Sequence, residues 1–440
     1  MANTQGLISA AKEIFNEALK RVDAGAAVRD AVRIDGANLL VRGEASVDLS
    51  RGLYVVAAGK AAYPMADAFS HAAGQYIKAG VISGSRPKSG SSLGPTWSKF
   101  FGGHPLPNEE SLEAARACMQ MLDQAGGERS PIIFLISGGG SAMMELPRDS
   151  RVTLPDLKDL NQVLVTSGAS IAEINSVRRA VSSVKGGGLA SRAVTSQQIS
   201  LIISDTRSED ITSVASGPSL RPDKGIPDPI SVIEKYGLEK MLPDIVTRSV
   251  KEHEGVLLPP GADSYFRVLL DNSQLVDQAA GIAREMGFVT DSDGGDRDDI
   301  IDEGVASILN QTSVLRRSVS ADKPVCFVSG GEFGCEVKGN GFGGRNCETV
   351  LRAGLLAEKD EELRHYAFLS AGTDGIDGNS PAAGGVIDEN TFMNARTKGL
   401  DPTRYLEDSD SYTFLKELDA AMEIGPTGTN VRDLRIVLAA

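Results

Sequence analysis

The chain has few of the residues that build disulfide scaffolds or histidine-based sites. Its 440 residues include four cysteines and four histidines. The cysteines form no C-x-x-C pair and are too sparse to cross-link a chain of this length, which indicates a reducing compartment. Four scattered histidines offer little material for a histidine metal site or a catalytic triad. Only His104, in the stretch 102–107, lies in a loop that looks shaped for a purpose.

Long apolar runs and excess positive charge are lacking too. No apolar run approaches the ~18 residues needed to span a bilayer, and residues 7–20 have the spacing of an amphipathic helix rather than of a signal peptide. The formal net charge of −14 leaves no broad cationic field for nucleic acid or an anionic membrane. We therefore expect a cytoplasmic protein with no nucleic-acid or membrane partner. The sequence leaves open whether the protein forms a homodimer.

Several familiar nucleotide-binding motifs are missing. The only Gly-Lys pair, Gly59-Lys60, lacks the upstream glycine and the following Ser or Thr of a Walker A loop. The H-R-D and D-F-G motifs of protein kinases are absent. The Gly138-Gly139-Gly140 turn is followed by Met143 where a dinucleotide fingerprint needs Gly or Ala. These absences disfavour P-loop NTPases, protein kinases and NAD(P)-dependent enzymes.

Short apolar runs alternate with longer helical stretches, which is typical of an α/β fold. Because most of these runs are nearly continuous, we expect mostly parallel sheets flanked by helices, and the length favours two domains. Strands are predicted at 53–58, 132–136, 199–204, 266–270, 325–329, 367–371 and 435–438. Helices are predicted at 109–124, 157–165, 171–184, 273–286, 299–311 and 347–356.

Two stretches are predicted to be loops. Residues 84–107 are dense in Gly, Ser and Pro, and residues 255–262 contain Pro259 and Pro260. The second stretch is the expected boundary, so that residues 1–255 and 262–440 form the two domains. The sequence leaves open which sheet the strand 435–438 joins.

The functional information lies where predicted strands end. Five strands run directly into polar, mostly glycine-rich turns: 59–60, 137–141, 204–206, 329–332 and 372–375. In open α/β sheets, ligands bind beyond the carboxyl ends of the strands. One such turn could be purely structural, but five in one chain indicate a binding site.

Some of these turns predict anion binding. Gly138, Gly139, Gly140 and Ser141 follow an apolar strand and precede a helix start, where free backbone N–H groups suit phosphate. A second predicted nest is the stretch Gly341 to Arg345, with Arg345 as a clamp, and Gly343, Gly344 and Asn346 are the predicted phosphate-binding residues there. The alternative for it is an ordinary loop with a solvated arginine. Lys60 follows a buried strand, where a lysine is costly unless it faces a cleft.

Acidic residues beside the turns predict a metal site. Mg²⁺ is held by one or two carboxylates plus substrate phosphates, and Asp205, Glu332 and Asp374 are the candidates. Alternatively, Asp374 and the nearby Asp377 simply form turns, since each is the first residue of an Asp-Gly pair.

A basic group lies on the predicted helix 171–184 and just beyond it: Arg178, Arg179 and Lys185. Capping of the helix C-terminus explains Lys185. Arg178 is a candidate to bind a substrate carboxylate, provided that its helix face borders the cleft.

Taken in order, the motifs resemble those of the glycerate 2-kinases that combine an N-terminal glycerate-kinase domain, Rossmann-like, with a C-terminal MOFRL-type domain. The resemblance covers nearly the whole chain. It rests on segments 58–62, 103–107, 137–142, 173–178, 185–187, 204–205, 215–218, 330–332, 343–346, 372–375 and 425–431.

The resemblance implies ATP- and Mg²⁺-dependent phosphorylation of D-glycerate to 2-phosphoglycerate, in a cleft between two α/β domains. It also implies that Lys60 and Arg345 lie in the active site, where they would stabilise the transferred phosphoryl group. Asp205 is expected either to orient the attacking hydroxyl or to hold the metal. The sequence does not separate these two roles.

Two departures from the family pattern leave the substrate open. After Asp205 the chain reads 206-TRSED-210 where the family usually has Val-x-Gly-Asp, and Arg432 stands where Asn is usual. An added arginine could recognise another anionic group, which keeps a kinase for a four-carbon sugar acid such as erythronate or threonate as an alternative. An NAD(P)H-dependent hydroxypyruvate reductase is a second alternative, and a non-catalytic sugar-acid or nucleotide sensor is a third.

Overall fold

The computed structural model describes residues 4–87, 90–207, 209–221, 225–252 and 264–440. The chain forms two compact units, and each is described by itself. The central unit is Ala24–Leu269, and the C-terminal unit combines Met1–Asp23 with Leu270–Ala440. The observed units differ from the expected division at 1–255 and 262–440 in two places: the N-terminal helix packs with the C-terminal unit, and residues 264–269 belong to the central unit. The expected boundary loop 255–262 lies outside the described residues.

The core of the central unit is a six-stranded sheet in the order β6-β5-β4-β7-β8-β9. Its strands are β4 (Leu53–Gly59), β5 (Ile77–Gly84), β6 (Trp97–Phe100), β7 (Ile132–Ser137), β8 (Gln198–Ile203) and β9 (Ser264–Leu270). The pairs β6/β5, β5/β4, β4/β7 and β7/β8 are parallel, as predicted. The sequence analysis missed β5 and β6, and β6 lies within the expected loop 84–107. As a four-residue edge strand with exposed Ser98 and Lys99, it lacks the apolar run that marks a central strand.

The other elements of this unit surround that sheet. The strands β1 (Val32–Asp35), β2 (Asn38–Val41) and β3 (Ala45–Asp48) form a small antiparallel sheet. The helices are α2 (Ala24–Ala31), α3 (Ala62–Ala73), α4 (Glu109–Glu128), α5 (Gly140–Met143), α6 (Leu154–Thr166), α7 (Ile171–Val181), α8 (Pro229–Lys235) and α9 (Asp244–Glu252). The helices α6 to α9 share their own apolar core, which includes Leu164, Val177, Val232 and Val246.

The C-terminal unit also has a six-stranded sheet, in the order β10-β11-β15-β12-β13-β14. Its strands are β10 (Val289–Ser292), β11 (Val325–Gly331), β12 (Tyr366–Gly372), β13 (Gly384–Asp388), β14 (Ala421–Met422) and β15 (Asp433–Ala439). Only β10/β11 pair in parallel, whereas β15 runs antiparallel to both β11 and β12. The expectation of mostly parallel strands does not hold in this sheet. Because helices cover both faces, the central strands β11, β12 and β15 are buried along their whole length whatever their direction.

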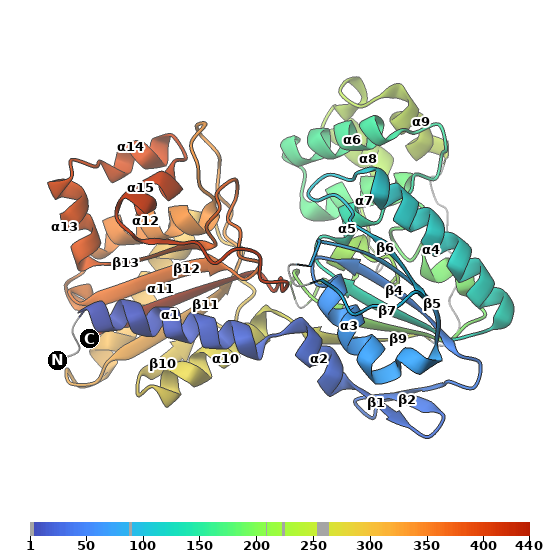
Figure 1. The fold of residues 1–440 in the computed structure, drawn as a ribbon. Coiled ribbons are helices and arrows are strands. Elements are labelled where there is room, and N and C mark those ends of the chain that lie inside the picture. Colours follow the sequence, from blue (N-terminus) through green and yellow to red (C-terminus); the bar gives the residue numbers. More distant parts are fainter. Residues whose placement is uncertain (1–3, 88–89, 208, 222–224, 253–263) are drawn as a thin grey trace. The chain divides into compact units, whose positions relative to one another are not determined.

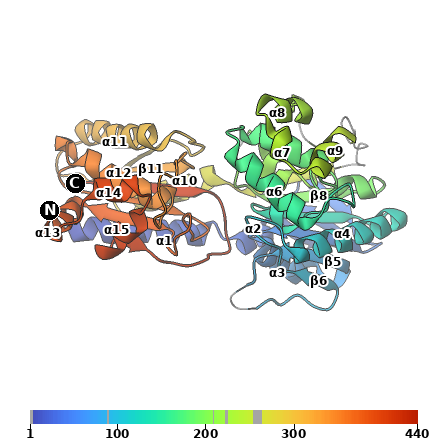
Figure 2. The same cartoon turned by 90° about the horizontal axis from the view of Figure 1, so that it is seen from above.

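Helices pack against both faces of this sheet (Figures 1 and 2). They are α1 (Thr4–Arg21) and α10 (Asn272–Glu285) on one face, and α11 (Ile301–Ser318) and α12 (Arg345–Ala357) on the other. The shorter α13 (Glu389–Thr397), α14 (Pro402–Glu407) and α15 (Ser411–Glu417) complete the unit. The apolar face predicted for the N-terminal helix buries Leu7, Ile14 and Phe15, which is why this segment belongs to the C-terminal unit. Among all described helices, none is both long and apolar enough to cross a membrane.

Candidate functional site

Three predicted site elements of the central unit meet at one edge of its sheet. Lys60 directly follows β4, the glycine turn directly follows β7, and Asp205 is the second residue after β8. These strands are neighbours and parallel, with Ala58 paired to Ile136 and Ser137 paired to Ile203. Their carboxyl ends therefore lie side by side, as the sequence analysis expected.

Close approach explains the glycines of this turn. The backbone N–H of Lys60 donates to the carbonyl of Gly138 at 2.8 Å. A Cβ added to Gly138 would lie 1.9 Å from Oδ2 of Asp205, so only glycine lets this carboxylate approach the turn. Gly139 has a φ of +81°, and a Cβ there would lie 3.0 Å from the ring of His104 and 3.2 Å from Cγ of Lys60. Lys60, His104 and Asp205 thus surround the glycine turn.

A hydrogen-bonded chain supports Ser141 at the end of this turn. Its hydroxyl lies 2.9 Å from the hydroxyl of Ser216, which donates to Oδ1 of Asn175 on α7 at 3.3 Å. Ala215 and Ser216 have positive φ angles of 51° and 60°. Residues other than glycine rarely adopt this backbone conformation, which is often found at functional sites. Sequence reasoning noted these residues only as part of a family motif.

A buried ion pair supports the same residue from inside the protein. The Lys185 ammonium pairs with Glu145 and donates to the carbonyl of Ser141 at 2.9 Å. Burial lowers the pKa of Lys185, and Glu145 opposes that shift. The interpretation of Lys185 as a helix cap is wrong, because α7 ends at Val181 and this side chain is only 2% exposed. Its partner Glu145 carried no sequence signal.

Arg178 lies on α7, and its Nε is buried without a hydrogen-bond partner. Burial lowers its pKa, with Glu145 acting in the opposite direction. Neighbouring Arg179 donates instead to the carbonyl of Thr212 at 3.1 Å. Nε of Arg179 is also buried without a partner, so the two arginines differ in that only Arg179 has a side-chain hydrogen bond to the protein among the described residues.

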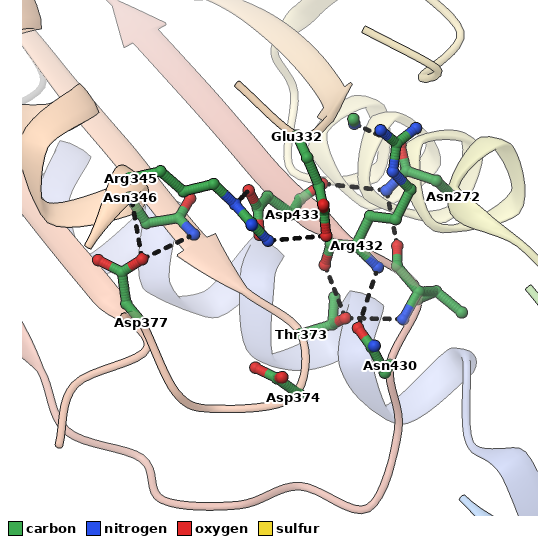
Figure 3. Close-up of polar contacts among 12 residues, drawn as sticks. Asn272, Glu332, Arg345, Asn346, Thr373, Asp374, Asp377, Asn430, Arg432 and Asp433 are labelled. Carbon is green, nitrogen blue, oxygen red and sulfur yellow. Dashed lines mark hydrogen bonds and ion pairs between the residues drawn. The ribbon is translucent and has the colours of Figure 1, made fainter. Parts of the chain in front are cut away.

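Arg345 is the centre of the candidate site in the C-terminal unit (Figure 3). It is the first residue of α12 and donates two hydrogen bonds to Asp433, from Nε to Oδ2 at 2.6 Å and from Nη2 to Oδ1 at 3.0 Å. Nη2 also donates to Glu332 at 2.7 Å. Burial alone would lower the pKa of Arg345, but the two carboxylates outweigh it and raise that pKa. Asp433 is 1% exposed, and no local pattern could reveal it as a partner 88 residues away.

The predicted anion nest beside Arg345 is occupied by the protein itself. Asp377 accepts from the backbone N–H groups of Asn346 at 3.0 Å and of Cys347 at 2.8 Å. A Cβ on Gly344 would lie 2.4 Å from the same carboxylate, and the N–H of Gly343 donates to a side chain rather than pointing into an open nest. Burial raises the pKa of Asp377 to about 6, against the effect of those N–H groups. The anion at the start of α12 is therefore Asp377 and not a phosphate.

The remaining acidic candidates do not form a metal cage. Glu332 is bound to Arg345, and Asp374 accepts from the N–H of Ile376 at 3.1 Å, which is the turn role weighed for it above. Within the described part of the chain, no group of three or more His, Cys, Asp or Glu residues is placed to hold a metal ion.

Arg432 does not have the freedom expected of a substrate-binding residue. Its side chain is 4% exposed and pairs with Asp298 and, at 3.6 Å, with Asp296. The structure therefore gives this departure from the family pattern an internal partner, contrary to the idea that it recognises a substrate anion.

Comparison with known proteins places the whole chain among characterised relatives. Residues 10–251 match a family described as "Domain of unknown function (DUF4147)", and residues 325–433 match the MOFRL family. D-glycerate 2-kinase of Thermotoga maritima is 38% identical over 87% of this chain and 90% of its own length. Glycerate 2-kinase of Pyrococcus horikoshii is 32% identical over 97% and 96%. The crystal structure of glycerate kinase from Thermotoga maritima aligns with 99% of this chain and 100% of its own, with a TM-score of 0.81 and 33% identity.

Proposed function

Since the chain belongs to the glycerate 2-kinase family, we propose that it transfers the γ-phosphoryl group of ATP to the 2-hydroxyl of D-glycerate and releases 2-phosphoglycerate and ADP. The observation that carries this proposal is the meeting of Lys60, the Gly138–Ser141 turn and Asp205 at adjacent strand ends. A cation, close-approach backbone and a carboxylate together suit phosphoryl transfer.

In this reaction the substrate hydroxyl oxygen forms a bond to the γ-phosphorus, and the bond between that phosphorus and the β,γ-bridging oxygen breaks. Lys60 supplies positive charge to the non-bridging oxygens, where it counts most in the transition state. Backbone N–H groups of the turn 138–141 bind phosphate oxygens. Asp205 accepts the hydroxyl proton or shares in holding the metal.

The group implied by this chemistry is Mg²⁺ bound to ATP. Asp205 is the carboxylate of the central unit best placed to share it, because it touches the glycine turn. Glu332 and Asp374, the metal candidates of the C-terminal unit, are engaged by Arg345 and by the N–H of Ile376. Mg²⁺ bound to the phosphates neutralises the charge that develops on them.

Arg345 is the proposed catalytic cation of the C-terminal unit. Both of its carboxylate partners hold the guanidinium in a fixed orientation. A preorganised cation costs no reorganisation when the phosphoryl group transfers, and loss of such a group typically lowers turnover ~100-fold or more.

The test is ADP release with ATP, Mg²⁺ and a panel of three- and four-carbon sugar acids. We expect D-glycerate to turn over, and we expect Lys60→Ala and Arg345→Ala each to reduce kcat ~100-fold or more. Identification of 2-phosphoglycerate rather than 3-phosphoglycerate in the product mixture fixes the hydroxyl. Absence of ADP release with every acid would refute the proposal.

The same panel separates the alternatives. Turnover confined to a four-carbon acid would keep the reaction type and change the substrate. Oxidation of NADH by hydroxypyruvate, without ATP, would instead support the reductase. The inward pairing of Arg432 removes the main structural reason for the four-carbon alternative.

A further inference from the structure

Three basic side chains of the central unit lie in the region of the Glu145 carboxylate. The segment that carries Arg148 pairs with the end of α7, since the N–H of Arg148 donates to the carbonyl of Val181 at 2.8 Å. Lys185 forms a direct ion pair with Glu145, while Arg148 and Arg178 both interact with that carboxylate through their charge. The nearby Asp149 is held by Arg151 at 2.6 Å. The cluster therefore holds more cations than anions, in a chain whose formal net charge is −14.

The carboxylate of Glu145 is bonded to groups other than the two arginines. Its Oε1 accepts from the N–H of Leu146 at 2.9 Å and from the hydroxyl of Ser182, and its Oε2 accepts from Lys185. Within the described chain neither Arg148 nor Arg178 forms an ion pair, and Nε of Arg178 has no hydrogen-bond partner. Burial lowers the pKa of both arginines, which reflects the cost of a cation without a bound counter-ion.

The surplus positive charge lies near the turn that is proposed to bind phosphate. Arg178 lies three residues after Asn175 on α7, so both side chains lie on the same helix face. Asn175 is linked through Ser216 to Ser141, and Lys185 binds the carbonyl of Ser141. The helix face that carries Arg178 is thus directed to the same turn that is proposed to bind phosphate.

We propose that Arg148 and Arg178 form the subsite for the carboxylate of the sugar acid, with Glu145 and Lys185 as the positioning pair behind it. A planar guanidinium matches a carboxylate with two parallel hydrogen bonds. An incoming carboxylate would supply the anion that this cluster lacks. This inference rests on the proposed kinase function and identifies Arg148, which the sequence analysis did not single out.

The test measures steady-state kinetics of Arg148→Met and Arg178→Met. We expect KM for D-glycerate to rise ~10- to 100-fold in each, the range expected when a charge-assisted bond is lost, while KM for ATP stays within about 2-fold of its original value. Glyceramide, which has no carboxylate, should be used equally poorly by the parent protein and both variants. Since each change removes a partly buried cation that forms no ion pair among the described residues, thermal stability should stay the same or rise.

Matched controls lie beside each arginine. Arg179→Met and Arg151→Met remove arginines that already have partners in Thr212 and Asp149, and neither should change KM for D-glycerate. An equal rise in KM for ATP, or unchanged kinetics in both test variants, would overturn the subsite. A fall in thermal stability with unchanged KM would also overturn it and assign the arginines a structural role.

A binding experiment separates failure of the subsite from failure of the kinase proposal. Calorimetric titration with D-glycerate, in the absence of ATP, should show binding to the parent protein and to the two controls but not to Arg148→Met or Arg178→Met. If the parent protein binds D-glycerate through these arginines but releases no ADP, the subsite stands and the kinase proposal fails. Binding that survives both substitutions refutes the subsite, whether or not the protein is a kinase.

Discussion

A single added methyl group should separate Asp205 from the glycine turn. In Gly138→Ala the new Cβ would lie 1.9 Å from Oδ2 and 2.3 Å from Cγ of Asp205. Relief to an ordinary contact of 3.4 Å requires a movement of about 1.5 Å. Gly138 has no positive φ, so this clash, rather than backbone strain, is the perturbation.

The expected effect on activity exceeds the effect on stability. Misplacement of a reacting group by ~1 Å can cost ~100-fold in rate, so we expect kcat for ADP release to fall by about that factor. Overpacking typically costs ~1–3 kcal/mol of stability, which thermal unfolding would register. Gly127→Ala on α4 is the matched control, because a Cβ there meets nothing within 4 Å, and it should leave both quantities nearly unchanged.

A double-mutant cycle with Asp205→Ala tests the cause. If Gly138→Ala acts by moving this carboxylate, it should add little to the loss already caused by Asp205→Ala. Multiplicative losses would show that the methyl group acts elsewhere in the turn. Normal turnover in a folded Gly138→Ala protein would refute the placement of Asp205 in the active site.

Three further outcomes are expected. Arg345→Ala should lower stability by ~3 kcal/mol or more as well as activity, since it leaves Asp433 buried without its main partner; calorimetry that finds no loss would contradict this. Because the folded-state pKa of Asp377 is about 6 against 3.8 for the free group, the parent protein should lose up to ~3 kcal/mol relative to Asp377→Asn as pH rises from about 4 to 7. Urea unfolding of both proteins at several pH values measures this loss. The intact mass confirms that the new amide beside Gly378 has not deamidated. A stability difference between the two proteins that does not depend on pH would refute the raised pKa of Asp377. EDTA should abolish ADP release, and Mg²⁺ should restore it without changing the unfolding temperature of the nucleotide-free protein; a metal-dependent unfolding temperature would indicate a protein-held ion instead.

The sequence predicted those parts of the fold that have strong local signals. All seven predicted strands are present, because buried strands such as β7 and β12 are continuous apolar runs. Strand direction in the C-terminal unit was not predictable, since an antiparallel strand covered on both faces, such as β15, has the same pattern as a parallel one. The N-terminal helix was predicted, but its assignment to the C-terminal unit depends on contacts with strands hundreds of residues away.

The candidate site shows the same division between local and distant information. Lys60, the glycine turn and Asp205 were predictable because each follows its strand within two residues. The partners of Lys185 and Arg345 were not predictable, because Glu145 is 40 residues from Lys185 and Asp433 is 88 residues from Arg345. The predicted anion nest shows a related limit: the sequence could not show that Asp377 accepts from the N–H groups of Asn346 and Cys347, or that Asn379 accepts from that of Gly343.

The packing of α1 has a consequence for how the protein is made. This helix is synthesised well before the strands β12 and β15 that it contacts. At typical rates of ~5–20 residues per second, its apolar face waits on the order of 20 to 80 s for these strands. The central unit, whose chain is contiguous, has no such delay. During synthesis the side chains of Leu7, Ile14 and Phe15 therefore lack their packing partners until β12 and β15 have been made, and α1 can take its final place only after that.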